Sequence, residues 1–237
     1  MGGIMKKEFK IALIVADPAE YEPAESRILE LGGKKAEFIG NKGVTLETTD
    51  ETQKTTLSAV LCGIGKVNAA AAAAYFAAVG YDAMISTGFS GGLADAGGFD
   101  AVLGTQYLEH DFDLTVLGYK PCEKPGQEYV YKCDKTLLEK YLSSGKKCLC
   151  GFMVAGDCFI SSDEKRDFFI NAYNAVACDM ETAAVASVCH KAKIPFLAIR
   201  RVSDNAGDSA AEDYSETNAS SQTLWFAEVV DWMLSLS

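Results

Sequence analysis

The chain has 237 residues, of which 49% are hydrophobic and 23% charged, a composition typical of folded proteins that leaves little room for long disordered segments. Its 33 Asp and Glu outnumber its 22 Lys and Arg, so the net charge is −11. This balance repels nucleic-acid backbones and anionic membrane surfaces, and we expect neither as a partner. Small neutral or cationic ligands remain open.

The first half of the chain alternates apolar runs with helical segments. Residues 9–16 (FKIALIVA) form a nearly continuous apolar run that stops at Asp17-Pro18, which predicts a strand buried on both faces. The elements expected next are a helix over 20–31, short strands over 36–62, an alanine-rich helix over 66–78, a strand over 81–86 and a glycine-rich turn over 87–92 (TGFSGG).

The second half continues the alternation. It predicts a strand over 101–109, a surface loop over 119–130, a helix over 135–142, strands over 150–155 and 175–178, a helix over 182–191, a strand over 195–202 and an amphipathic helix over 220–236. No internal repeat or linker interrupts the pattern. We therefore expect residues 1–237 to form a single three-layer α/β/α domain.

Acidic residues follow several of the predicted strands, where ligands bind in sheets of this kind. Asp17 and Glu20 follow the first strand, Glu181 follows 175–178, and Ser203-Asp204 follow the last strand. In a chain with 33 acids, chance places some of them there, and negative charge at a helix start explains Glu20 or Asp204 equally well. The residues alone indicate a pocket rimmed with acids.

The remaining motifs argue against phosphate-binding loops, metal sites and membrane or export segments. TGFSGG and Gly63-Ile64-Gly65-Lys66 both fall short of phosphate-binding loops. The eight cysteines contain no C-x-x-C pair and there are only two histidines, so we expect no metal site and reduced, structural thiols. Residues 1–10 lack the apolar core of a signal peptide, and the longest apolar stretch is too short to cross a bilayer, so we expect a cytoplasmic protein.

Four stretches together resemble the nucleoside phosphorylase/nucleosidase superfamily, and within it the bacterial 5′-methylthioadenosine/S-adenosylhomocysteine nucleosidases. They are GIGKVNAAAA (63–72), STGFSGGLA (86–94), HDFDLT (110–115) and GDCFISS…DMETAAVASVCHKAKIPFLAIRRVSDNAGD (156–208). The resemblance covers nearly the whole chain. It implies a nucleoside phosphorylase-like fold with a central mixed twisted sheet, and hydrolysis of the N-glycosidic bond between adenine and a 5′-thio-substituted ribose.

The resemblance also implies roles for individual residues. Asp204 matches the general acid that protonates purine N7, and Glu20 matches the residue that orients and deprotonates water, which is the two-carboxylate logic of glycoside hydrolysis. Glu181 matches the glutamate that binds the ribose hydroxyls, with Met180 packed against the sugar. Asp204 would need a raised pKa, which a water-poor pocket supplies.

Further positions follow in the same way. Ser203 would orient Asp204, Arg200 would support the water site, Phe159 would stack on adenine, and the Ile160 backbone would read the purine edge. Tyr214 falls where the family places an aromatic over the 5′-substituent, and Leu114 and Leu117 would line the alkylthio pocket. The resemblance further implies a homodimer, a place in methionine salvage, and no metal or organic cofactor.

Two alternatives to this reaction stay open, and so does the substrate, since related nucleosidases act on aminodeoxyfutalosine or other nucleosides. Phosphorylases of this fold hold phosphate with arginines where this chain has Glu20 and Ser86, and a carboxylate there repels phosphate. A phosphate-dependent phosphorylase is therefore the second reading, and a non-catalytic nucleoside-binding protein the third. Phe89 stands where nucleosidases usually have a small polar residue, so either Ser90 holds the water instead or the pocket has a different shape.

Overall fold

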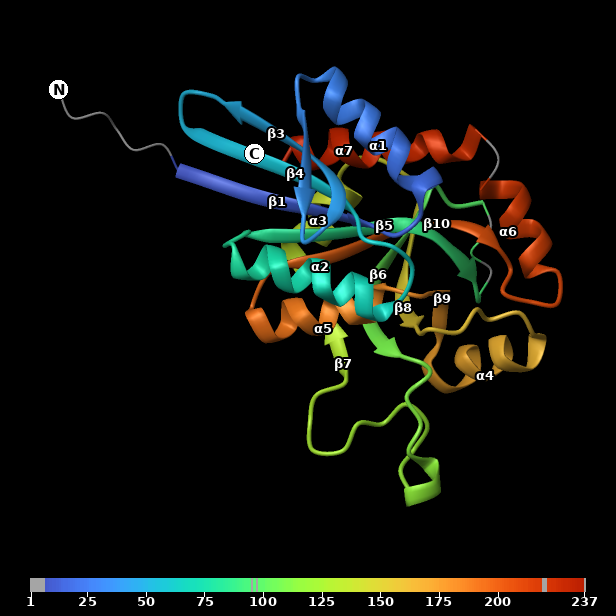
Figure 1. The fold of residues 1–237 in the computed structure, drawn as a ribbon. Helices are drawn as coiled ribbons and strands as arrows, with labels where there is room; N and C mark the ends of the chain where they lie inside the picture. Colours follow the sequence, from blue (N-terminus) through green and yellow to red (C-terminus); the bar gives the residue numbers. More distant parts are fainter. Residues whose placement is uncertain (1–6, 95, 97, 219–220, 237) are drawn as a thin grey trace.

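Continuous apolar runs form the central strands of the structure, a computed structural model that describes residues 7–94, 96, 98–218 and 221–236. In this part of the chain, ten strands form one sheet (Figure 1). They are β1 (Lys7–Val15), β2 (Lys34–Phe38), β3 (Asn41–Thr49), β4 (Gln53–Leu61), β5 (Ala83–Gly92), β6 (Ala101–Glu109), β7 (Val130–Lys132), β8 (Cys148–Ala155), β9 (Ala175–Asp179) and β10 (Phe196–Asp204). Ile11 to Val15 of β1 are buried because β1 pairs in parallel with β4 on one side and β5 on the other.

The sheet is mixed and partly closed on itself. Its strands follow the order β10-β6-β8-β9-β5-β1-β4-β3-β2, with β7 beside β6. Because β10 also pairs with β5, the strands β5, β9, β8, β6 and β10 complete a ring. The ring brings the last residues of three strands together, since Gly91 of β5 lies opposite both Cys178 of β9 and Asp204 of β10.

Helices cover both faces of the sheet, which confirms the predicted three-layer fold (Figure 1). The helices are α1 (Pro18–Glu30), α2 (Lys66–Ala78), α3 (Lys135–Leu142), α4 (Asp163–Tyr173), α5 (Thr182–Ala192), α6 (Ala210–Asn218) and α7 (Trp225–Leu234), with short 3₁₀ turns η1 (Thr115–Leu117) and η2 (Ser221–Leu224). α1 and α7 pack on one face through residues such as Tyr21 and Phe226. α2 and α5 pack on the other through small residues such as Ala73 and Ala186.

The structure differs from the sequence predictions at a few places. The predicted turn 87–92 is the buried end of β5, and Ser203 and Asp204 are the last residues of β10. Helices α4 and α6 were not predicted. The expected C-terminal helix is divided into η2 and α7, and its first residue, Ser220, lies outside the described residues.

Residues 1–6, which belong to the N-terminal segment predicted to lack a signal peptide, also lie outside the described part of the chain. Within the part that is described, no helix has the length and apolar character needed to cross a membrane.

Candidate active site

A cavity of about 150 Å³ opens where β1, β5, β9 and β10 end. Its lining comes from the loops and strand ends that the ring of strands draws together. The lining residues are Ala16, Asp17, Glu20, Ile64, Phe89, Ser90, Gly91, Cys158, Phe159, Ile160, Cys178, Asp179, Met180, Glu181, Ser203, Asp204 and Tyr214. All of the site residues predicted from the sequence are among them except Arg200, Leu114 and Leu117.

Asp204 forms one corner of the cavity, at the end of β10. Its carboxyl accepts hydrogen bonds from Ser203 Oγ at 2.7 Å and from the Ala206 backbone N–H at 2.8 Å. Burial raises the pKa of Asp204, and these two hydrogen bonds oppose the rise because they favour the charged form. Oδ1 lies against β5, since a Cβ added at Gly91 would be 3.0 Å from it.

Glu20 forms a second corner, in the first turn of α1. Asp17 caps that helix by accepting a hydrogen bond from Ala19 N–H at 2.7 Å, and the turn points Glu20 back at β5. The Glu20 carboxyl accepts the Phe89 N–H at 2.7 Å. Burial raises its pKa to about 8, although this hydrogen bond and the charge of Arg200 lower it.

Glu181 forms a third corner, just before α5. It accepts the Gly65 N–H at 2.9 Å, which links the site to the turn that precedes α2. Burial and, after it, the charge of Asp179 raise the pKa of Glu181 to about 7, whereas Arg200 lowers it. Glu20 and Glu181 are therefore two buried carboxyl groups that both titrate near or above neutral pH.

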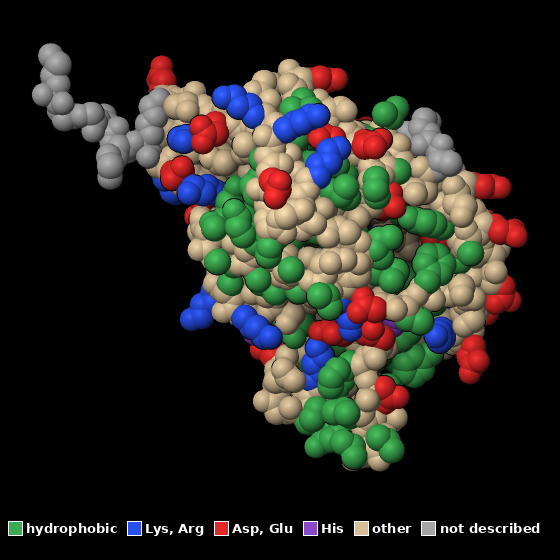
Figure 2. All heavy atoms as spheres, viewed as in Figure 1, with side chains coloured by type: hydrophobic (Ala, Val, Ile, Leu, Met, Phe, Trp, Pro, Cys, Tyr) green, Lys and Arg blue, Asp and Glu red, His purple; other side chains and the backbone are tan. Residues whose placement is uncertain are grey.

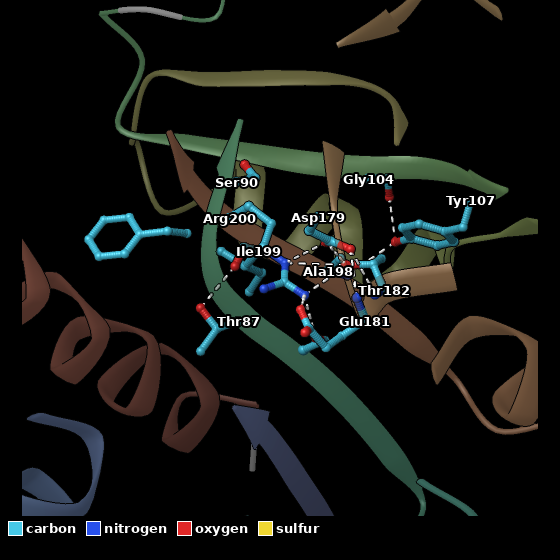
Figure 3. Close-up of polar contacts among 12 residues, drawn as sticks. Thr87, Ser90, Gly104, Tyr107, Asp179, Glu181, Thr182, Ala198, Ile199 and Arg200 are labelled. Atoms are coloured by element: carbon cyan, nitrogen blue, oxygen red, sulfur yellow. Dashed lines mark hydrogen bonds and ion pairs between the residues drawn. The ribbon is translucent and has the colours of Figure 1, made fainter. Parts of the chain in front are cut away.

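Arg200 lies behind the cavity wall, where its guanidinium group contacts the side chains of Asp179 and Glu181 (Figure 3). Its Nε is 3.0 Å from Asp179 Oδ2, and its Nη2 donates to Ser86 Oγ at 2.9 Å and to Thr182 Oγ1 at 2.8 Å. Nη2 is also 4.0 Å from Glu181 Oε2. Asp179 in turn accepts the Thr182 hydroxyl and the backbone N–H groups of Glu181 and Thr182. The charge of the guanidinium is thus paired with that of Asp179.

Gly88 lets Arg200 and Glu20 approach the same point of β5. A Cβ added there would lie 2.4 Å from Arg200 Nη1 and 2.7 Å from Glu20 Oε2. Its φ of +153° also disfavours a larger residue. The positive group and the carboxyl therefore face each other across this glycine, beside the cavity.

Phe159 and Tyr214 form an aromatic rim. Their rings meet edge to face with centroids 6.0 Å apart, and Phe159 is 41% exposed. Phe159 comes from the segment between β8 and α4, and Tyr214 comes from α6. Burial raises the pKa of the Tyr214 phenol, so it stays protonated at neutral pH. A flat apolar ligand can enter between these rings and the strand ends.

Phe89 does not fill the cavity in the way its size suggests. Its ring packs edge to face on Phe226 in the core beneath α7, with centroids 5.1 Å apart, while its N–H holds Glu20. Ser90 follows it, and the Ser90 Oγ is buried without a hydrogen-bond partner among the described residues. The expected small polar side chain is thus present one residue later.

Leu114 is not brought to this cavity within one chain. It is half-buried next to η1, in a segment that projects from the body of the molecule (green in Figure 1). Figure 2 shows hydrophobic side chains gathered on the same projection, where Val116 is 91% and Leu117 67% exposed.

Several lining residues were given no role from the sequence. Asp17 was expected at the rim of the pocket but without a role, and Asp179 stands at the end of β9, a position that could have assigned it to the site as well. Cys158 and Cys178, predicted to be structural, also line the cavity, and no sequence signal distinguishes them from the other free cysteines. Among the residues that the structure describes, no group of His, Cys, Asp or Glu could hold a metal ion.

This combination of a mixed sheet, helices on both faces and buried acids at the strand ends is matched by known proteins. A sequence model described as the phosphorylase superfamily matches residues 10–230, so the chain belongs to that superfamily. Its relatives by sequence are 5′-methylthioadenosine/S-adenosylhomocysteine nucleosidases, which confirms the resemblance. The enzyme of Shewanella loihica is 35% identical over 160 residues, which are 64% of this chain and 70% of the relative.

Solved structures of related enzymes have the same fold as this chain. The nucleosidase of Neisseria meningitidis in complex with methylthio-immucillin-A is 29% identical, with a TM-score of 0.81 over 95% of this chain and 99% of that one. Futalosine hydrolase of Helicobacter pylori has a TM-score of 0.83 over 97% of this chain and 100% of that one. At 23% identity, the second match shows a shared fold.

Proposed function

We propose that this chain hydrolyses the N-glycosidic bond of 5′-methylthioadenosine, S-adenosylhomocysteine or both, and releases adenine and the thioribose. The observation that carries the proposal is the placement of two buried carboxyl groups along β5. Glu20 contacts the strand at Phe89 and Asp204 contacts it at Gly91, two residues or about 7 Å further along. Both carboxyl groups therefore reach the cavity from the same stretch of one strand, as an acid and a base that act on one bond require.

Each carboxyl group has one task in the reaction. Asp204 gives a proton to the purine, so that adenine leaves as a neutral base when the C1′–N9 bond breaks. Water adds its oxygen to C1′ of the oxocarbenium ion, and Glu20 takes the proton that the water loses. Ser203 orients Asp204 through their 2.7 Å hydrogen bond, and Arg200 faces Glu20 across Gly88 to support the water.

The remaining residues hold the nucleoside. Glu181 accepts hydrogen bonds from the ribose hydroxyls, and Met180 packs against the sugar. Phe159 stacks on adenine while the Ile160 backbone reads its edge, and Ser90 supplies the hydroxyl at the water site. All of them line the one cavity.

The protonation states suit this division of work. A raised pKa keeps part of Asp204 protonated as the acid. Burial raises the pKa of Glu20 to about 8, but an oxocarbenium ion beside it favours the charged carboxylate. We therefore expect a bell-shaped pH profile of kcat/KM, whose apparent pKa values belong to the coupled acids as a group.

Phosphorolysis is the weaker reading on this geometry. A phosphate would have to approach Glu20, and the nearby guanidinium of Arg200 already pairs with Asp179 at 3.0 Å. Ser86, which stands where a phosphorylase has an arginine, is engaged by Arg200 as well. A buried carboxyl group next to a guanidinium that is already paired repels phosphate.

The enzyme acts as a homodimer in this proposal, in the cytoplasm and in methionine salvage. The exposed Val116 and Leu117 support the dimer, because an apolar projection is stabilised when it is covered. In the dimer, Leu114 and Leu117 of one copy close the 5′ side of the other copy's cavity. Leu117→Asp should give monomers in analytical ultracentrifugation and reduce turnover, whereas dimers with normal turnover would contradict this arrangement.

The test of the function is release of adenine from 5′-methylthioadenosine and S-adenosylhomocysteine in phosphate-free buffer, followed by chromatography. We expect adenine and free thioribose, at a rate that added phosphate does not increase. Formation of ribose 1-phosphate derivatives would show a phosphorylase. Binding without turnover, seen as a raised melting temperature, would show a nucleoside-binding protein.

A further inference from the structure

One wall of the cavity is polar where an alkylthio pocket would be apolar. Asp17 and Tyr214 both line the cavity. Asp17 is the N-cap of α1, whose first turn carries Glu20, so it lies at the Glu20 corner. The resemblance places Tyr214 over the 5′-substituent.

Asp17 can serve a ligand and the helix at the same time. Its Oδ1 caps α1 through the 2.7 Å hydrogen bond from Ala19 N–H. Its Oδ2 accepts no hydrogen bond from the residues that the structure describes, and the side chain is half-buried at the cavity. A half-buried carboxylate attracts a cation more strongly than one in open water does.

Tyr214 complements this carboxylate. Its hydroxyl both donates and accepts hydrogen bonds, which a phenylalanine ring cannot do. A carboxylate and a phenol on the lining of one cavity suit a group that donates several hydrogen bonds, and they gain nothing from a methyl sulfide.

We propose that the wall formed by Asp17 and Tyr214 selects adenine nucleosides whose 5′-substituent carries an amine over those whose 5′-substituent is an uncharged alkylthio group. This inference rests on the proposed function, because it places the purine at Asp204 and the 5′ side at the other end. It names the substrate class that the proposed function leaves undecided.

The experiment compares 5′-amino-5′-deoxyadenosine with 5′-methylthioadenosine, two adenine nucleosides that differ only in the 5′-substituent, in the full-length protein. The readout is the ratio of their kcat/KM values for adenine release at neutral pH. Asp17→Asn removes the charge and keeps a side chain that caps helices equally well. Asp134→Asn is the matched control, because Asp134 caps α3 in the same way and lies outside the cavity lining.

We expect the wild-type protein to favour the amine. The ratio should fall about fivefold or more in Asp17→Asn and about threefold in Tyr214→Phe, and stay unchanged in Asp134→Asn. A wild-type preference for the methylthio nucleoside, or a ratio that Asp17→Asn leaves unchanged, would overturn the proposal.

Failure of the proposed function is distinguishable from failure of this inference. If the wild-type protein releases adenine from neither probe, the hydrolase is wrong, and calorimetric binding of the same two nucleosides replaces turnover as the readout. Tighter binding of the amine that Asp17→Asn abolishes would then still support the selective wall. Equal binding of the two probes would overturn it.

Discussion

Replacing Glu20 by glutamine should make the protein more stable in alkaline solution while it removes the catalytic base. Burial raises the pKa of Glu20 from 4.5 to about 8 in the folded protein. Between these two values the folded protein keeps a proton that the unfolded chain has lost, so stability is greatest at low pH and falls as pH rises. Glutamine has no such proton and keeps an oxygen to accept the Phe89 N–H at the same place.

The size of the effect follows from the difference in pKa. Each pH unit between the two values costs about 1.4 kcal/mol of unfolding free energy. Relative to pH 4, the wild-type protein should lose about 3 kcal/mol at pH 7 and about 5 kcal/mol above pH 9 through this one group. For a domain of this size, the larger loss lowers the melting temperature by roughly 10 °C or more.

The measurement is thermal and urea unfolding of wild type and Glu20→Gln at pH 5, 7 and 9, at constant ionic strength. The two proteins should unfold alike at pH 5 and diverge as the pH rises, with the variant more stable. Glu22→Gln is the control, since Glu22 is exposed on the same helix. Parallel pH dependence in wild type and Glu20→Gln would refute the reasoning, because Glu20 would then not hold a proton in the folded state.

Three further results are expected. Asp204→Asn should lower kcat by about 10²- to 10⁴-fold in the adenine-release assay, since the proton donor is lost. The dissociation constant of the nucleoside should stay within a few-fold of the wild-type value. Near-normal turnover would mean that the acid is another residue. Gly88→Ala should destabilise the protein by about 2–5 kcal/mol in urea unfolding and abolish turnover, because the alanine Cβ would lie 2.4 Å from Arg200 Nη1. A stable, active Gly88→Ala variant would show that Arg200 and Glu20 do not meet at this glycine. Arg200→Met should cost about 3–5 kcal/mol of unfolding free energy, since it leaves Asp179 buried without its cation, and a neutral outcome would contradict that pairing.

The apolar core of the fold could be predicted because buried strands and helices have recognisable hydrophobic patterns in the sequence. Residues 9–16 and 195–202 are mostly apolar, and they cover most of β1 and β10. Helix α4 leaves little such record, since Phe169 is its one buried residue among those described. It is recognisable only from its Ser162 cap and the acids of its first turn.

The end of β5 was predicted wrongly for a physical reason. TGFSGG has the composition of a turn, but its glycines serve close packing within a strand. A Cβ at Gly91 would lie 2.9 Å from Cys178 Sγ and 3.0 Å from Asp204 Oδ1. Only the closure of the strand ring brings those two side chains there, and neighbouring residues in the sequence carry no sign of it.

Some features of the candidate site could also be predicted from the sequence, and others could not. Glu20, Glu181 and Asp204 each follow a strand, so the sequence could predict that they meet. The partners of Arg200 could not be predicted, because its contacts with Asp179 and Ser86 depend on which strands are neighbours. The roles of all these residues stay predictions until the variants are measured.

Asp179 joins the folding of α5 to the charge balance of the site. The same carboxylate accepts the N–H groups that begin the helix and neutralises the buried guanidinium. Any local opening that unwinds the first turn of α5 therefore also separates Arg200 from its counterion, Asp179, and leaves a buried charge unpaired. The amides of Glu181 and Thr182 should consequently exchange with deuterium only through cooperative, near-global unfolding, unlike those of a helix end that frays on its own.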